Sequence, residues 1–542
     1  MNHEKSIVGS TCAQKRRLMT GNLQVGSPLL FIAAAAVVLL CSCAKHPDPA
    51  GVDLPSVAQT LPAQPVTGTH YAQSPWASVH RDSRNSDYVP LAVSTRVAPA
   101  WSALEGAALL VGPVIGPEGN LYVPSGRGTG TSHLHAFSPA GKLLWETAPM
   151  RSLADFDYAA VVSAPIIDTD GNVYACDSNQ LWSFTAQGRM RWVADLTVHG
   201  IAGFFVTPVF SHEGAVGGIS TDGKVAFFNR EDGSLAFDVL DLPGVSGPPS
   251  REPPPGLCGG GLLAPEFVRP LWDLIYGREV EVANTPAVSP QSGRIFITAG
   301  GATQDDGVLY GIDTSPEGLR LAFSAPMGAG SGTSPAISPD GSLVYAIDDA
   351  GLMIAIDARS GERAWEAADT MGQASPTVGG DGTIYSFNGM RGTIVAIDGA
   401  SGALKWSRQY DDIARAHLGW RPLLDRVATV DSIITATDNG LLAFLDLNYR
   451  LPIGEGEYPQ PRKIVVVQLS LEDGAVLGWF EARDSSGAFV VPDANGRLYL
   501  TLSSAATSIS YYGVDPKLPW FLRAGIKPVG GFVAMTPATV GQ

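Results

Sequence analysis

Residues 355–365 read AIDARSGERAW, and residues 396–406 read AIDGASGALKW. The two stretches place alanine, aspartate, glycine and tryptophan at the same offsets, and looser copies end at Trp145, Trp192, Phe237, Phe323 and Trp479. A scatter of surface aromatics would not keep a fixed distance from a glycine turn. The pattern therefore indicates an internal repeat.

A second element of the repeat is a small residue followed by proline, a hydrophobic pair and a glycine-centred turn. Such blocks begin at Gly112, Ala164, Thr207, Thr285, Ser334 and Ser375. They recur every 40 to 50 residues or so, with longer gaps where loops are inserted, which is about the period of a four-stranded propeller blade. The Asp-Gly and Glu-Gly steps inside them predict hairpin turns, because glycine tolerates positive φ.

The repeated motif resembles the tryptophan-docking motif of the PQQ-like propeller superfamily, the quinoprotein alcohol dehydrogenase-like proteins, over about four-fifths of the chain. The resemblance implies an all-β fold, an eight-bladed propeller of four-stranded antiparallel blades. It also implies that the motif aromatics dock between neighbouring blades. Those assigned this role are Trp145, Trp192, Trp365, Trp406 and Trp479.

Six blades are expected between Gly112 and Trp406. A seventh is expected from Arg421 to Trp479, and an eighth from Gly487 to the region of Phe521. Trp101 precedes the first block, so its strand is expected to pair with the last blade and remove an open edge. Trp520 competes with Trp101 for that position.

The first 43 residues have the pattern of a targeting segment. Basic residues 15–17 precede an apolar run over residues 28–40, which is too short for a comfortable membrane span. The run ends in Leu40-Cys41-Ser42-Cys43, which resembles the bacterial lipobox. The resemblance implies lipidation at Cys43 and an outer-membrane lipoprotein facing the periplasm or the cell surface. A plain secretory signal and an uncleaved anchor are the alternatives.

This division assigns residues 1–43 to a signal peptide, 44–90 to a tether and lead-in rich in proline and alanine, and 91–542 to the propeller. Two segments interrupt the repeats, at 241–284 and 448–463. The first combines proline-rich and apolar stretches, consistent with a short amphipathic helix that caps the channel, docks a partner or packs on the ring.

The composition excludes nucleic acid as a partner, because the net charge is −16 and no basic patch accompanies the aromatics. After removal of the signal, Cys43, Cys176 and Cys258 remain. Cys176 and Cys258 form either a disulfide or two buried thiols. No metal-ligand spacing is present, and no metal is assigned.

Propeller topology sorts loops onto two faces, and ligands of the superfamily usually bind on the face that carries the loops between second and third strands. Residues expected around that channel mouth are Asp157, Tyr158, His199, Asp305, Asp306, Asp348, Asp349, Arg391, His417, Trp420 and Arg421. Their carboxylates suit Ca²⁺, but most of these aspartates are expected simply to occupy turns.

Two functions fit these features. The first is an exported, lipid-anchored binding or scaffold module that contacts envelope proteins, since the chain is similar to the propeller lipoprotein of the outer-membrane barrel-assembly machinery. The alternative is a quinoprotein dehydrogenase that oxidises an alcohol or sugar with PQQ and Ca²⁺. The adjacent cysteine pair typical of PQQ alcohol dehydrogenases is absent from the mature sequence, and the catalytic residues are not identified. The sequence therefore favours the binding module.

Overall fold

The structure, a computed structural model, describes residues 70–107, 109–126, 132–147, 163–177, 179–245, 284–301, 306–330, 333–348, 350–367, 375–389, 391–421, 424–453, 456–503, 507, 509–523 and 525–538. The signal segment, Cys41, Cys43, Cys258 and the interior of the 241–284 insertion lie outside these ranges. Cys176 is a buried free thiol. Burial raises the pKa of this thiol well above its usual value.

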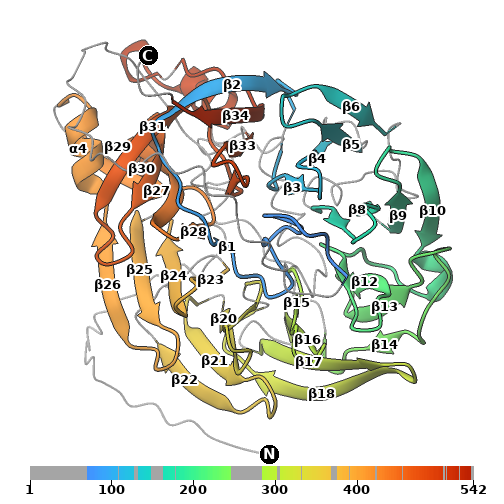
Figure 1. Ribbon diagram of the computed structural model, residues 1–542. Coiled ribbons are helices and arrows are strands. Elements are labelled where there is room, and N and C mark those ends of the chain that lie inside the picture. Colours follow the sequence, from blue (N-terminus) through green and yellow to red (C-terminus); the bar gives the residue numbers. More distant parts are fainter. Residues whose placement is uncertain are drawn as a thin grey trace, which may run out of the picture.

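Eight sheets stand around a central axis like the blades of a propeller (Figure 1). The first three blades are β3–β6 (Val114–Ile115, Leu121–Gly126, Ser132–Phe137, Leu143–Glu146), β7–β10 (Ile166–Ile167, Val173–Asp177, Gln180–Phe184, Met190–Asp195) and β11–β14 (Val209–Phe210, Val216–Ile219, Lys224–Phe228, Leu240–Asp241). The next three are β15–β18 (Ala287–Val288, Ile295–Ala299, Val308–Ser315, Gly318–Pro326), β19–β22 (Ala336–Ile337, Leu343–Ile347, Met353–Asp357, Arg363–Ala367) and β23–β26 (Thr377–Val378, Thr383–Asn388, Thr393–Asp398, Leu404–Gln409).

Blades 7 and 8 are more elaborate. Blade 7 consists of β28 (Thr435–Thr437), β29 (Gly440–Ile453), β30 (Gly456–Leu469) and β31 (Val476–Ala482), joined by β1 (Tyr88–Val89) and β27 (Asp425–Val430). Blade 8 consists of β32 (Val490–Pro492), β33 (Leu498–Leu502), β34 (Gly531–Pro537) and β2 (Val97–Ala103). The helical segments are η1 (Thr197–His199), α4 (Asp411–His417), η3 (Ile509–Val514), η4 (Asp515–Lys517) and η5 (Trp520–Leu522). Within the described ranges, no helix has the length and apolar character of a membrane span.

The prediction of an all-β propeller of eight blades is confirmed. The ring closes as expected, because β2 pairs antiparallel with β34 and opposes Trp101 to Ala534. Trp520 has no part in the closure, since it lies in η5 and is 77% exposed. The predicted end of blade 8 near Phe521 was wrong: its third strand begins at Gly531, after a long connection whose aromatic residues imitate the motif.

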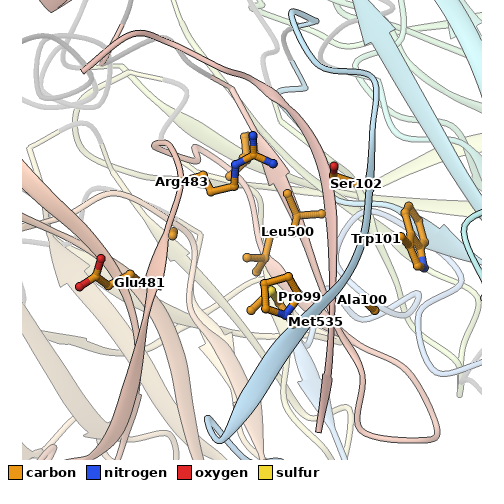
Figure 2. Close-up of a pocket in the computed structure, with 11 residues that line it drawn as sticks. Pro99, Ala100, Trp101, Ser102, Glu481, Arg483, Leu500 and Met535 are labelled. Atoms are coloured by element: carbon orange, nitrogen blue, oxygen red, sulfur yellow. The ribbon is translucent and has the colours of Figure 1, made fainter. Parts of the chain in front are cut away.

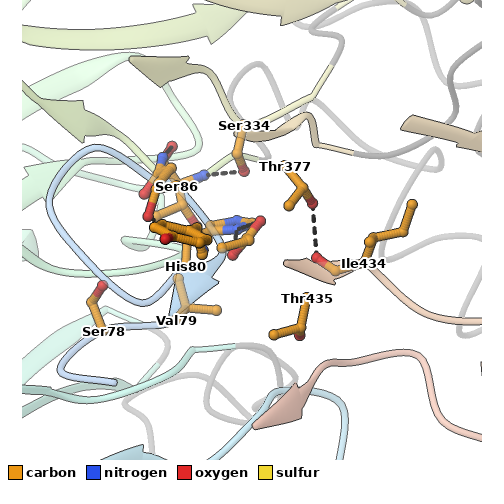
Figure 3. A network of polar contacts seen from close by, with 12 residues as sticks. Ser78, Val79, His80, Ser86, Ser334, Thr377, Ile434 and Thr435 are labelled. Atoms are coloured by element: carbon orange, nitrogen blue, oxygen red, sulfur yellow. Dashed lines mark hydrogen bonds and ion pairs between the residues drawn. The ribbon is translucent and has the colours of Figure 1, made fainter. Parts of the chain in front are cut away.

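Serine and threonine residues next to the proline of blades 3 to 6 have a structural role. Thr207 and Thr285 bring their hydroxyl groups within 3.2 Å of each other between blades 3 and 4, and Ser334 Oγ accepts from Thr285 N at 3.0 Å between blades 4 and 5. Thr377 donates to Ile434 O between blades 6 and 7, a contact visible in Figure 3. These hydroxyl groups join neighbouring blades at their inner strands.

The docking motif has a physical explanation that Trp365 illustrates. Its indole Nε1 donates to Gly399 O of the next blade at 3.0 Å, and its ring fills the space beside Gly402, where an added Cβ would lie 2.6 Å away. Gly402 has φ of 73°, and the carboxylate of Asp398 closes the turn by accepting from Ser401. The same ring-on-glycine contact joins Trp101 with Gly141, Trp145 with Gly188, Trp192 with Gly233, Phe323 with Gly361 and Trp406 with Gly474.

Trp479 lies elsewhere. Gly478, one position earlier, occupies the place of the docking aromatic, and Thr95 Oγ1 lies where a Cβ at residue 478 would point. Trp479 instead projects to the opposite side of β31 and makes an edge-on contact with His417, with ring centroids 4.6 Å apart. The sequence assigned it to docking because the offset from its glycine turn differs by only one residue.

Replacement of Gly402 by alanine should lower the free energy of unfolding by about 2–4 kcal/mol. The loss has two causes: alanine is strained at this positive φ, and its Cβ would clash with the Trp365 ring. Gly200→Ala is the matched control, since Gly200 has φ of 75° but no atom within 4 Å of an added Cβ. It should lose only about 1 kcal/mol. Urea unfolding of both variants measures the difference, and equal losses would show that the ring contact contributes little.

Candidate functional site

The axis of the ring is occupied by the chain's own N-terminal described segment, residues 70–93, which we call the plug. Figure 1 shows it in blue at the centre of the blades. The sequence predicts a tether and lead-in for most of these residues, but their side chains are largely buried, and Trp76 is fully so. The segment has no repeat of its own, so periodicity did not reveal that the ring would enclose it.

The plug makes main-chain hydrogen bonds with the innermost strands of six blades. Its carbonyl groups accept from strand amides, and one of its own amides donates to a strand. The pairs, in order along the plug, are Ala72 N to Ile167 O, Ile115 N to Trp76 O, Val288 N to Ser83 O, Ile337 N to Arg84 O, Val378 N to Ser86 O and Ala436 N to Asp87 O. β1 then runs parallel to β28. One segment thus satisfies the inward-facing amides around most of the ring.

Buried charges stabilise the plug in its bent path. Asp82 accepts from Arg81 Nη1 at 2.6 Å and from the Ser86 hydroxyl at 2.9 Å. Burial would raise the pKa of the Asp82 carboxyl, but Arg84, Arg81 and Ser86 outweigh it and hold the pKa below its usual value. His80 Nδ1 lies 3.0 Å from Asp87, whose pKa burial raises to about 6 (Figure 3 shows His80 among the inner strands).

The bends of the plug require left-handed backbone at residues other than glycine. Arg81, Asn85 and Asp87 have φ of 70°, 56° and 54°. Asn85 compensates by donating from Nδ2 to Thr285 O at 3.1 Å and to Pro335 O at 2.9 Å. Strained residues persist only where their surroundings over-determine them, as they do in this channel.

Asn85→Ala should lower the free energy of unfolding by about 2–4 kcal/mol. The variant loses two buried hydrogen bonds, and alanine adopts the left-handed backbone conformation of this position less readily than asparagine does. Asn85→Gly keeps the backbone freedom and loses only the hydrogen bonds, so it should fall between the wild type and the alanine variant. Thermal unfolding of the three proteins gives the order. A wild-type midpoint for Asn85→Ala would mean that the plug does not stabilise the ring.

Seven of the residues expected around the channel mouth are described, and four of these seven lie apart from one another. His199, Asp306, Asp348 and Arg391 belong to four different blades or links between blades, and Asp306 and Arg391 are exposed. Asp348 is buried because its carboxylate accepts from Ala350 N and Leu352 N within a turn. Asp157, Tyr158, Asp305 and Asp349 lie outside the described residues. Among those described, no group of histidine, cysteine, aspartate or glutamate side chains could hold a metal ion.

The three remaining mouth residues, His417, Trp420 and Arg421, gather beside a long hairpin. β29 and β30 each span 14 residues and extend past the ring on the side of the loops between second and third strands, and β27 pairs with the extension. The described residues of the 448–463 insertion, 448–453 and 456–463, are therefore regular β-structure. α4 packs against this hairpin, with aspartates in its first turn and Arg415 and His417 in its last, as the helix dipole favours.

The long connection of blade 8 packs against the same hairpin. Gln460 Nε2 donates to Leu522 O at 3.0 Å, and Arg421 Nη1 donates to Phe521 O at 3.2 Å. The exposed fractions of Trp420, Trp520 and Phe521 are 74%, 77% and 54%. We call the surface formed by Trp420, Arg421, Arg462, Trp520, Phe521 and Arg523 the aromatic platform. The sequence identifies two of its members, Trp420 and Arg421. The contact of their loop with the blade 8 connection depends on the tertiary fold.

An acidic cluster lies buried beneath this region, at the junction of blades 7 and 8. Asp431, Asp446 and Asp484 are almost completely buried, and both carboxylate oxygens of Asp446 have no hydrogen-bond partner. Asp484 accepts from Val529 N and Gly530 N and so fixes the blade 8 connection. Burial, together with Asp484, raises the pKa of Asp446 to about 8. Burial and both neighbours raise that of Asp431.

A small apolar pocket of about 170 Å³ opens at the same junction, between β31 and β2. Figure 2 shows Pro99, Leu500 and Met535 lining it, with Arg483 at its edge. The pocket lies at the junction where Gly478 stands in place of a docking aromatic.

Asp446→Asn should change how stability depends on pH. Because the native carboxyl binds its proton more tightly than an unfolded one, wild-type stability falls as pH rises from near 3.8 to about 8. Asparagine has no proton to lose, so the variant should lose less stability between pH 5 and pH 9, as measured by urea unfolding. Asp425→Asn, on the exposed part of β27, should follow the wild type. Parallel curves for all three proteins would contradict the assignment.

Comparisons with known proteins agree with the ring. The fold and repeats define the chain as an eight-bladed β-propeller with aromatic docking between blades. A family model described as outer membrane protein assembly factor BamB matches residues 269–443. Protein Rv3035 of Mycobacterium tuberculosis (strain ATCC 25618 / H37Rv) is 24% identical over 298 residues, which are 54% of this chain. The match spans 65% of that protein, less than two thirds of its length.

Two solved structures are similar to the chain. A europium-containing methanol dehydrogenase matches 85% of this chain and 98% of its own, with a TM-score of 0.56 and 13% identity. BamB from Moraxella catarrhalis matches 81% and 99%, with a TM-score of 0.44 and 13% identity. At such identity, the likeness to the dehydrogenase shows the fold alone.

Proposed function

We propose that this chain is an exported, lipid-anchored propeller that acts as a binding or scaffold module in the cell envelope. The observation that carries the proposal is the filled channel. The plug forms main-chain hydrogen bonds with the inner strands of six blades, so it fills the channel at the level of these strands. A partner at this level would therefore contact the rim or the outer faces of the ring. The match of residues 269–443 to the BamB family model and the lipobox-like sequence at Cys43 support an envelope location.

The alternative, a PQQ- and Ca²⁺-dependent dehydrogenase, fits the described residues less well. A planar cofactor on the axis at the level of the inner strands would have to displace Trp76, His80 and Asn85, all of them buried and the last two hydrogen-bonded within the ring. The likeness to the methanol dehydrogenase does not extend beyond the fold. We therefore derive no oxidation step for this chain.

The envelope anchor predicts a specific covalent modification. The chain expressed in a Gram-negative bacterium that is fed radiolabelled palmitate should take up label and sediment with membranes. Cys43→Ala should lose both properties, whereas Cys41→Ala, two residues earlier, should keep them. Label retained by Cys43→Ala would contradict the anchor. Stoichiometric uptake of PQQ with Ca²⁺ by the purified protein would favour the dehydrogenase instead.

A further inference from the structure

The aromatic platform combines exposed aromatic rings with positively charged side chains. Three large apolar rings are more than half exposed, and they lie among arginines on a molecule whose net charge is −16. Exposed aromatic groups grouped with arginine are typical of interaction surfaces, because the rings supply large contact areas with few flexible bonds and arginine supplies a planar group with five hydrogen-bond donors.

The arginines are held in fixed positions. Arg421 and Arg462 each stack on the ring of Tyr449, with guanidinium carbons 5.2 and 5.1 Å from its centroid. Tyr449 is itself fixed by donating to Gly419 O at 2.5 Å. Arg523 donates from Nε to Leu518 O and makes no ion pair within the described part of the chain. A preorganised guanidinium group loses little entropy when a carboxylate binds to it.

The platform and the two ends of the plug lie at opposite faces of the ring. The plug enters the ring where His70 contacts His212 O, beside the turn between the first two strands of blade 3. It leaves where Val93 contacts Asn439, in the corresponding turn of blade 7. The platform lies at the opposite end of the strands, around the loop between the second and third strands of blade 8. His70, the first described residue, therefore lies at the opposite face of the ring from the platform.

These observations favour a protein over a lipid surface. The platform's cations are arginines, which are enriched at protein interfaces where lysine is depleted, and the nearby Lys463 is paired with Glu481. The positive charge of the platform arginines attracts a negatively charged partner, whereas the acidic remainder of the chain repels it.

We propose that the aromatic platform binds an acidic segment of a partner protein. Carboxylates of the segment pair with the arginines, and its apolar side chains cover Trp420, Trp520 and Phe521. This inference rests on the proposed binding function and names the chemistry of the partner.

Selection of phage-displayed random dodecapeptides tests it. The bait is the full chain carrying Cys43→Ala, which cannot be acylated at that residue. Recovered peptides should be enriched in aspartate and glutamate together with apolar residues. Their affinity should fall about tenfold or more in the double variant Trp420→Ala, Arg523→Glu. The matched control is Val198→Ala, Arg189→Glu, which removes an exposed apolar group and reverses a charge in blade 2 and its link. It should bind like the parent chain.

Recovered peptides without acidic enrichment, or equal binding to both double variants, would overturn the proposal. Sedimentation of the same proteins with phosphatidylglycerol vesicles supplies the other arm. Vesicle binding that the platform variant loses would assign the surface to a membrane and would also overturn it. Palmitate labelling at Cys43 is independent of these results, so failure of the peptides alone leaves the anchored module intact.

Discussion

An indole ring in the space of a missing side chain is the contact on which the propeller depends. Each docking tryptophan needs a glycine in the next blade, because any Cβ there would overlap the ring. The same glycine needs positive φ to close its hairpin, so one residue type meets two constraints. This double requirement explains why the motif keeps its spacing while most other positions vary. It also makes each blade incomplete without its neighbour, so the ring has to close.

Closure pairs a strand from the N-terminal part of the described chain with its last strand. β2 supplies the outer strand of blade 8, and Trp101 docks on Gly141 of blade 1 just as later tryptophans dock on their neighbours. The residues just before β2 form the plug, so the strand that closes the ring and the segment that fills it are continuous. The hydrogen bonds of the plug fix the inner strands while the docking aromatics fix the outer ones.

The sequence was sufficient to predict the parts that repeat. Period, turn glycines and docking aromatics gave the fold, the blade count and the closure by Trp101, because each reflects local geometry imposed many times. The plug was missed because it occurs once, and its burial depends on a channel that the other blades create. The platform was half found: Trp420 and Arg421 stood out by type, but Trp520 and Phe521 join them only through contacts such as Arg421 with Phe521 O. The buried position of Asp446 is likewise set by tertiary packing.

The unusual features of blades 7 and 8 follow from one topological fact. The third and fourth strands of blade 8 come from opposite ends of the chain, so no hairpin joins them and no glycine turn is available to the preceding blade. A docking aromatic on β31 would have nothing to dock on, and Gly478 with Thr95 takes its place, beside a small apolar pocket. Trp479 is then free to face the other way, where His417 and Lys463 contact it. Those contacts support α4 and the long hairpin, so the closure of the ring also positions the surface that we assign to a partner.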